Sequence, residues 1–527
     1  MLLLIGSVNL VNLLLIRASG RARELAIRQS LGASHWHVMR QVMTETVLLC
    51  LVGGLCGLAL AGGGIGLLQT LGVDQLPLGA YIGFDGRFAL VALSGTVVLG
   101  ILIALPVAWF SVRVHLANAF RSASRSATTN RAAQRLRHSF IVAQICLAFV
   151  LLAGAGLLGI SLKHVMETSP GFQAGQVLAG ALSLPYKKYP DPAARLALIE
   201  RLLAAIQNQS GVASAAVGNL APFGGNDSSG VTAVEGVEIA NGGSQQDHYR
   251  NGVVGDYWRA LDIPLLRGRL LEDADNRRKQ RVCVVDRAFA RRYWPGCSPL
   301  GRRLNDGPVF NKDEAFTIVG VVGTVKQNKL DDANPKGTIY YPYKYWPDPS
   351  ISVLVRTGMA TEAMAPVLRR TALAVDPELP FYNLKPMRSL IGESVVTRRS
   401  PAVLAGIFAV VALLLTAVGT YGVLAYAVGQ RRREIGVRMA LGARQQQVLR
   451  QFLGLGAKLL LAGISFGMLG AWATGRVMQH LLFGVGSVHL GVVAATAGLM
   501  IGVVLLATSL PAYSASRVSP TEALRDE

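Results

Sequence analysis

The sequence predicts a polytopic α-helical membrane protein with about seven transmembrane helices and one large mixed α/β domain outside the membrane. The first observation is composition, because 51% of the 527 residues are hydrophobic and only 16% are charged, whereas soluble domains carry about 25% charged residues. The second is a set of apolar runs of about 20 residues, the length that crosses a bilayer. The third is the stretch 163–400, which is mixed in charge, interrupted by Pro and Gly, and long enough to bury its own core.

The predicted spans follow the apolar runs in chain order. They cover residues 1–16, 42–68, 88–112, 138–162, 401–428, 452–475 and 490–511. The first is short, since such a helix extends only about 24 Å and the hydrocarbon core is about 30 Å thick. A signal peptide is the alternative for this run, but no basic residue precedes it and no small-residue cleavage site follows it.

A duplicated basic segment organises the chain. RARELAIRQSLGA, residues 21–33 (the first elbow), returns as RRREIGVRMALGA, residues 431–443 (the second elbow), at a constant offset of 410 residues. This offset is too wide for a solenoid repeat. We therefore interpret the chain as two copies of a membrane unit, each with one basic elbow. Met1 aligns with Val411, which predicts that the chain starts inside the first matching span.

Both elbows carry the pattern of a short helix. Glu24 precedes Arg28 by four residues, as Glu434 precedes Arg438, and this orientation of acid and base favours a helix. Such a pair stabilises a helix by only about 0.2–0.5 kcal/mol, so stability alone is a weak reason for its duplication. The pattern fits either an interfacial helix anchored by arginines or a docking surface for a cytoplasmic partner, and the duplication favours docking.

Each elbow is expected to stop sharply before the next span. Gly32 and Gly442 follow the helical pattern, and glycine adopts the left-handed conformation that ends many helices. Ser34 comes two residues later in the first copy and can cap the following helix.

The charge distribution predicts the topology. The loops 17–40, 113–137 and 429–451 and the tail 512–527 hold nineteen Arg or Lys, and the short opposite loops 69–87 and 476–489 hold two. Positive residues remain on the cytoplasmic side, so the elbows are predicted to be cytoplasmic and the large domain extracytoplasmic. The net charge of +21 is explained in this way, and no nucleic-acid partner is predicted.

The large domain shows alternating strand and helix patterns. Strands are predicted at 177–183, 282–285, 316–322 and 351–356, and helices at 193–207 and 361–375. The first helix should bury one face that carries Leu196, Ile199, Leu203 and Ile206. An aromatic cluster at 340–346 is expected to be core or a partner surface. Cys283 and Cys297 could form a disulfide outside the cytoplasm, and the sequence leaves their bonding open.

These motifs together resemble the FtsX/MacB-type ABC transporter permeases. The REx₃Rx₂LGA elbows, the closing segment 510–525, and the pair DRAFARRYWPGCSPLGRRL and FTIVGVVGTVK (286–304 and 316–326) carry the resemblance. It implies three-span permease units at 1–137 and 401–527, a transmembrane helix at 138–162, and a MacB-like periplasmic core domain at 163–400. It also implies that the first copy lacks its first span and outer domain, as in a truncated form of a longer protein.

The resemblance assigns the elbows as coupling helices that dock on an ATPase subunit. The residues to which it assigns this role are Arg23, Glu24, Arg28, Leu31, Gly32, Arg433, Glu434, Arg438, Leu441 and Gly442. No catalytic or metal-binding residue is predicted, because the sequence has no GxxxxGK[ST] phosphate loop, HExxH or GxSxG motif. The expected protein is therefore not itself an enzyme and holds no cofactor, and ATP would bind to the partner subunit.

The resemblance also implies a location and partners. We expect a multi-pass protein of the bacterial inner membrane that contacts lipid, an ABC ATPase subunit, and a periplasmic adaptor or outer-membrane channel. Its function would be export, or transmission of force to the outer domain. The alternative is a non-transporting membrane scaffold that regulates cell-envelope hydrolases, as some FtsX-like proteins do.

Overall fold

The computed structural model divides the chain into two compact units. Residues 1–164 and 398–527 form one unit (the helical unit), and residues 165–397 form the other (the α/β domain). The structure describes residues 1–20, 34–72, 85–119, 127–225, 227–237, 247–430, 435, 437–439, 441 and 444–516.

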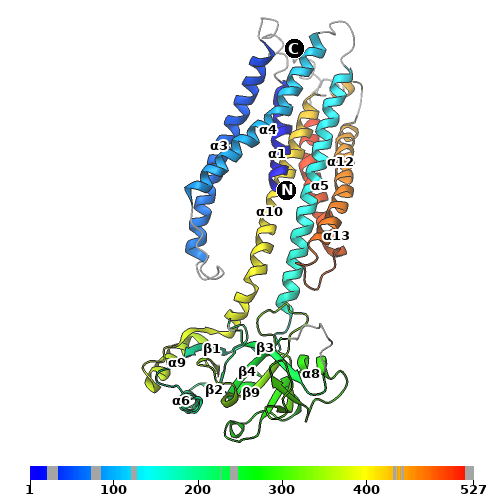
Figure 1. Cartoon of the computed structure of the whole chain (residues 1–527). Helices are drawn as coiled ribbons and strands as arrows, with labels where there is room; N and C mark the ends of the chain where they lie inside the picture. The colour runs from blue at the N-terminus through cyan, green and yellow to red at the C-terminus, as the bar shows by residue number, and fades with distance from the viewer. Residues whose placement is uncertain are drawn as a thin grey trace. The chain divides into compact units, whose positions relative to one another are not determined.

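Long apolar helices make up the helical unit (Figure 1). They are α1 (Leu2–Gly20), α3 (His35–Gly72), α4 (Gly86–Ala119), α5 (Ala127–Glu167), α10 (Met387–Gln430), α12 (Gln445–Val477) and α13 (Leu490–Ser516). Among the described residues, six of these helices are long and apolar enough to cross a membrane, and α1 is shorter, with its apolar part at Leu2–Ala18. The prediction of about seven spans therefore corresponds to six full-length candidates and the short first helix.

The duplication is visible in where the helices begin. α3 starts at His35 and α12 at Gln445, the same offset that separates the elbows. The structure places Ser34 at the predicted cap position, directly before α3, where its hydroxyl lies 2.8 Å from Nδ1 of His37. In the second copy the backbone N–H of Arg444 donates to the side chain of Gln447. Each copy then pairs two helices, α3 with α4 and α12 with α13.

Close helix packing in the second copy depends on glycine. A Cβ atom on Gly463 of α12 would overlap Ile145 of α5, and one on Gly467 would lie 2.8 Å from the Cβ of Phe149. Small residues allow helix backbones to approach in lipid. The equivalent glycines of the first copy are Gly53 and Gly57, and there no atom of the described chain lies within 4 Å of such a Cβ. The equivalent glycines are therefore packed against another helix in the second copy, whereas those of the first copy have no described neighbour.

One sheet organises the described residues of the α/β domain. Its strands are β1 (Val177–Ser183), β2 (Val212–Gly218), β3 (Ser229–Val234), β4 (Asp247–Gly255), β5 (Leu265–Gly268), β6 (Val282–Asp286), β7 (Arg303–Asp306), β8 (Phe316–Val322), β9 (Thr338–Pro342), β10 (Ser350–Thr357) and β11 (Tyr382–Pro386). The strand order is β11-β1-β10-β2-β4-β3-β7-β8-β6-β9, with β5 on β8, and β9 also pairs with β4. The last contact closes β4, β3, β7, β8, β6 and β9 into a ring.

Two hydrophobic cores lie on this sheet. The open part, β11 to β2, packs against α6 (Pro192–Gln207) and α9 (Thr361–Val375), with Leu198, Leu202 and Leu368 among the buried residues. The ring encloses a second core with Phe289 of α8 (Arg287–Tyr293). The predicted strands and both predicted helices are confirmed to within two residues, and so is the mixed α/β class of the domain.

The structure corrects the details of the predicted helix face. Leu196 is only half-buried, whereas Leu198 and Leu202, which the pattern missed, are buried with Ile199, Leu203 and Ile206. α6 packs against both the sheet and α9, so its apolar face is wider than one stripe.

The aromatic cluster and the two cysteines belong to the structural core or its edge. Tyr340, Tyr341 and Tyr343 are completely buried, which agrees with the prediction of core packing. Cys283 is buried in β6 and Cys297 is exposed, and both are free thiols. The disulfide that the sequence left open is therefore not formed in this structure.

Candidate functional site

The best candidate for a functional site is the described part of the second elbow. Ile435 and residues 437–439 are helical, and the N–H of Leu441 donates to the carbonyl of Val437 at 3.0 Å. The predicted short helix is thus present before α12 begins. Arg438 and Leu441 are the predicted docking residues that the structure describes.

This helix has one buried face. Ile435 is only 5% exposed and belongs to a cluster with Leu424 and Val428 of α10, Val448 and Phe452 of α12, and Ala512 of α13. Met439, one turn after Ile435, packs against the same cluster. The elbow is therefore anchored in the ends of three membrane helices, and a force on it would reach all three.

The opposite side of the helix is exposed and apolar. The side chain of Leu441 is 83% exposed and that of Val437 is 42% exposed, and residues four apart lie on one side of a helix. Arg438 stands between them, with Nη1 at 3.4 Å from Oε1 of Gln451 on α12. Arginine is enriched among the residues that dominate binding at protein interfaces, so Arg438 beside this exposed apolar pair is compatible with a docking surface.

Eight of the ten predicted docking residues lie outside the described part of the chain. They are Arg23, Glu24, Arg28, Leu31, Gly32, Arg433, Glu434 and Gly442. The docking role of all ten remains a prediction. The pattern missed two residues that the geometry brings into the site, Val437 on the exposed side and Ile435 on the buried side. Val437 lies four residues before Leu441, and Ile435 lies four residues before Met439. This helical spacing is the signal that could have identified both residues.

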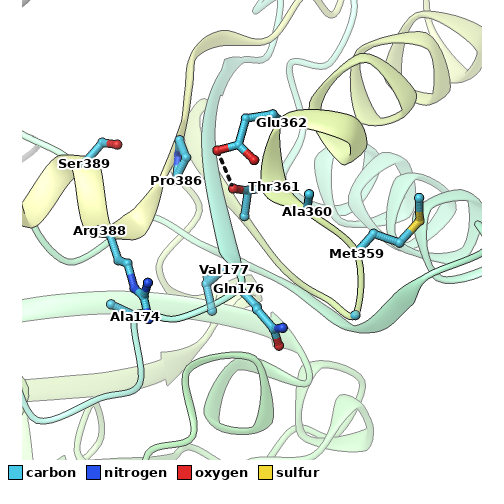
Figure 2. Close-up of a pocket in the computed structure, with 11 residues that line it drawn as sticks. Ala174, Gln176, Val177, Met359, Ala360, Thr361, Glu362, Pro386, Arg388 and Ser389 are labelled. Carbon is cyan, nitrogen blue, oxygen red and sulfur yellow. Dashed lines mark hydrogen bonds between the residues drawn. The ribbon is translucent and has the colours of Figure 1, made fainter.

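The α/β domain contains a shallow pocket of about 390 Å³ (Figure 2). It lies between the first turn of α9, the start of β1 and the first turn of α10. Glu362 accepts a hydrogen bond from Thr361 at 3.1 Å, and Figure 2 shows Arg388 reaching toward Ala174 on another side. No metal-binding cluster occurs among the described residues. We assign it no chemistry.

Two buried titratable groups in the α/β domain are structural. Burial raises the pKa of Asp286 to about 7, yet its carboxylate accepts the N–H of Phe289 at 2.8 Å and so caps α8. Burial lowers the pKa of His248 to about 4, and its ring contacts the carbonyl of Lys336 and the hydroxyl of Tyr293 at 2.5 and 2.7 Å. Both side chains are completely buried, so no substrate can reach them.

The shifted pKa of Asp286 predicts a pH-dependent stability. Because its pKa is raised by folding, its favourable contribution is present below about pH 4 and is lost as the pH rises through 7. Asp286→Asn should keep the cap acceptor and flatten this dependence, and Asp286→Ala should be less stable than Asp286→Asn by about 1 kcal/mol at every pH. Thermal unfolding of the full chain in nanodiscs at pH 5 and pH 8, followed by tryptophan fluorescence, measures both effects. Equal stability of the two variants would contradict the capping role.

The fold defines a class of protein, a multi-pass membrane protein with a large extramembrane domain. Residues 1–119 and 406–520 match the model of the FtsX-like permease C-terminal region, and residues 155–371 match the MacB-like periplasmic core domain. The chain therefore belongs to the FtsX/MacB-like ABC permeases. It is a multi-pass protein of the bacterial inner membrane, and its α/β domain is extracytoplasmic.

Individual relatives share part of the chain. The probable syringafactin export ATP-binding/permease protein SyfD of Pseudomonas syringae pv. tomato is 30% identical over 295 residues, which are 53% of this chain and 42% of SyfD. The macrolide export ATP-binding/permease protein MacB of Escherichia coli is 26% identical over 293 residues, 53% of this chain and 43% of that relative. The chain thus spans less than half the length of the curated relatives it matches.

Solved structures resemble part of the chain. The periplasmic region of MacB from Actinobacillus actinomycetemcomitans is 16% identical, with a TM-score of 0.30, over 43% of this chain and 95% of that structure. The extracellular domain of the ABC-type transporter YknZ from Gram-positive bacteria is 15% identical, with a TM-score of 0.27, over 39% of this chain and 100% of that structure.

Proposed function

We propose that this chain is the permease component of an ABC transporter that couples ATP hydrolysis on a separate ATPase subunit to movement of the α/β domain. The observation that carries the proposal is the two-sided helix of the second elbow. Leu441 and Val437 are exposed apolar side chains. Full burial of an exposed side chain of this kind is favourable by about 1.5–3 kcal/mol, and the mostly exposed Leu441 has the most to gain from a partner.

The buried side of the same helix supports a coupling role. Ile435 and Met439 pack on the ends of α10, α12 and α13, and close-packed interiors transmit displacement. A partner that moves on binding or hydrolysing ATP would therefore move the membrane helices through this contact. α10 begins at Met387, directly after β11 of the α/β domain, so the chain itself continues from the elbow to that domain.

A separate ATPase subunit is the simplest source of ATP hydrolysis. The curated relatives are named ATP-binding/permease proteins, and this chain matches less than half of each. Its own sequence contains no GxxxxGK[ST] phosphate loop, the segment that holds the phosphates of ATP in such ATPases. In our proposal ATP therefore binds to the partner, and the two elbows, residues 21–33 and 431–443, are the docking surfaces.

Reversing the charges of the second elbow tests the docking. We expect Glu434→Lys with Arg438→Glu to lower the ATPase activity that the chain confers on its ATPase subunit by about tenfold, because like charges across an interface cost several kcal/mol. The assay is ATP hydrolysis with the full chain in nanodiscs. The matched control reverses an exposed ion pair of the α/β domain, Lys385→Glu with Glu393→Lys, whose charged atoms are 2.6 Å apart. Unchanged activity of the elbow variant would remove this docking assignment.

The transported cargo is a separate part of the proposal. Relatives are named for the export of syringafactin, macrolides and pyoverdine, so we propose export with no specific substrate. Efflux of a fluorescent macrolide from proteoliposomes that contain the chain and its ATPase subunit tests this directly. ATP hydrolysis without efflux of any of these three compound classes would favour force transmission over export.

A further inference from the structure

A polar cluster lies inside the helical unit, where α1, α5 and α10 meet. Asn9 of α1 is 5% exposed and Gln144 of α5 is completely buried. The Nδ2 of Asn9 donates to the backbone carbonyl of Leu415 on α10 at 2.6 Å, and the Nε2 of Gln144 donates to the same oxygen at 2.8 Å. One carbonyl thus receives side-chain donors from two other helices.

Such a cluster holds helices in register. A buried amide inside a membrane protein is costly unless it forms hydrogen bonds, and polar side chains that cross between helices join them at a defined level. Asn9 comes from the first copy of the repeat, and Leu415 and Gln144 from the second. The cluster therefore connects the two copies.

The two copies meet at equivalent residues. Asn9 of α1 corresponds to Gly419 of α10 at the offset of the repeat, and these two residues are in contact. A Cβ on Gly419 would overlap Oδ1 of Asn9 and would lie 2.6 Å from Oε1 of Gln144. In a twofold arrangement, equivalent residues touch each other only at the axis. The contact between Asn9 and Gly419 therefore fits a pseudo-twofold axis between the copies at this point.

The next pair of equivalent residues is unlike in the same way. One turn further along, Asn12 of α1 is 1% exposed and corresponds to Gly422 of α10. A Cβ on Gly422 would lie 3.3 Å from Leu13. The first copy thus carries asparagine at both positions where the second carries glycine. Two asparagines would overlap at the axis, and two glycines would leave a gap without the bond to Leu415.

We propose that this asparagine–glycine complementarity makes the two copies within one chain pair with each other, in preference to pairing between like copies of two chains. The partner of α1 is then α10 of the same polypeptide, and one chain supplies both members of the pair. A polar residue at one buried position of a helix interface commonly specifies which helices pair. The inference does not rest on the proposed ATPase docking, because it concerns the contact between helices alone.

Cross-linking distinguishes pairing within a chain from pairing between chains. In full-length protein with its five native cysteines replaced by serine, Leu13→Cys and Gly422→Cys are combined and treated with a short bifunctional thiol reagent in native membranes. We expect the peptide that carries Cys at position 13 to be linked to the peptide that carries Cys at position 422, in protein that has the mass of one chain. Neither single-cysteine variant should give a band at the mass of two chains. Absence of the link in the double variant, or a double-mass band from a single cysteine, would overturn the proposal.

Substitution at the axis tests the specificity. In the double-cysteine protein, Gly419→Asn should lower the yield of the cross-link by at least about tenfold, because overpacking of a filled contact is destabilising. Adding Asn9→Gly should restore most of the yield, since the flexible end of Gln144 can then turn into the space that Asn9 leaves. Gly406→Asn on the same helix is the matched control, because a Cβ there has no neighbour within 4 Å. The role of Asn9 and Gly419 would be excluded if Gly419→Asn gave the same cross-link yield as the double-cysteine protein. It would also be excluded if adding Asn9→Gly did not restore the yield.

Discussion

Gly463→Leu is expected to destabilise the second permease unit, whereas Gly53→Leu, the same change at the equivalent position of the first copy, is expected to be tolerated. The Cβ of Gly463 would already overlap Ile145 and would lie 3.3 Å from the carbonyl of Val142. A leucine side chain must therefore push α12 away from α5 along the whole contact. Gly53 has open space beside it, where a leucine would face lipid.

The expected cost of Gly463→Leu is about 3 kcal/mol or more, the upper part of the range for overpacked cores. In a chain of this size that corresponds to a fall of roughly 3 °C in the unfolding midpoint. Fluorescence-detected size exclusion after heating of the full chain in detergent measures the midpoint. Gly53→Leu is the matched control, because it makes the same substitution of glycine by leucine at the equivalent position of the other copy. Equal effects of both variants would show that α5 does not pack on Gly463.

These two glycines show where sequence reasoning ends. The repeat predicted that α3 and α12 are equivalent, and their starts at His35 and Gln445 confirm it. It could not show that one glycine face is packed and the other open, because that depends on a third helix, α5, whose contacts are not encoded in the repeat. Within α3 the central apolar window is 6% buried, and within α12 it is 39% buried.

Local patterns predicted the α/β domain well where one face was buried. Strand 177–183 and helix 361–375 agree with β1 and α9 residue for residue. Helix α6 was harder, because Leu198 and Leu202 are buried beyond the single stripe that was counted. The ring of strands was also not predictable, since the parallel pairing of β4 with β9 joins segments about ninety residues apart and no local signal reports it.

The polar cluster of α1, α5 and α10 had a partial signal in the sequence. Asn9 and Asn12 interrupt an otherwise apolar run, and polar residues inside membrane spans commonly have a specific role. Gln144 lies in a similar run of α5. Only the structure shows that Asn9 and Gln144 share the carbonyl of Leu415, because the three residues are distant in sequence.

Leu441→Asp is expected to abolish binding of one ATPase subunit without unfolding the chain. The leucine is 83% exposed, so the substitution should change the stability of the chain by no more than about 0.5 kcal/mol. At a docked interface it would remove an apolar contact and bury a carboxylate, which together cost about 3 kcal/mol, roughly a hundredfold in affinity. Val309→Asp, at a residue that is 75% exposed in the α/β domain, is the control for an exposed apolar-to-acid change.

The duplication makes this prediction quantitative. Leu31 is the equivalent of Leu441 in the first elbow, so Leu31→Asp and Leu441→Asp should each leave one ATPase subunit bound per chain, and the double variant should bind none. Native mass spectrometry of the complex in nanodiscs counts the bound subunits. Two subunits on either single variant would show that the leucine is not the anchor. Loss of both subunits in one single variant would show that the elbows do not act as separate sites, since independent surfaces lose their partners one at a time.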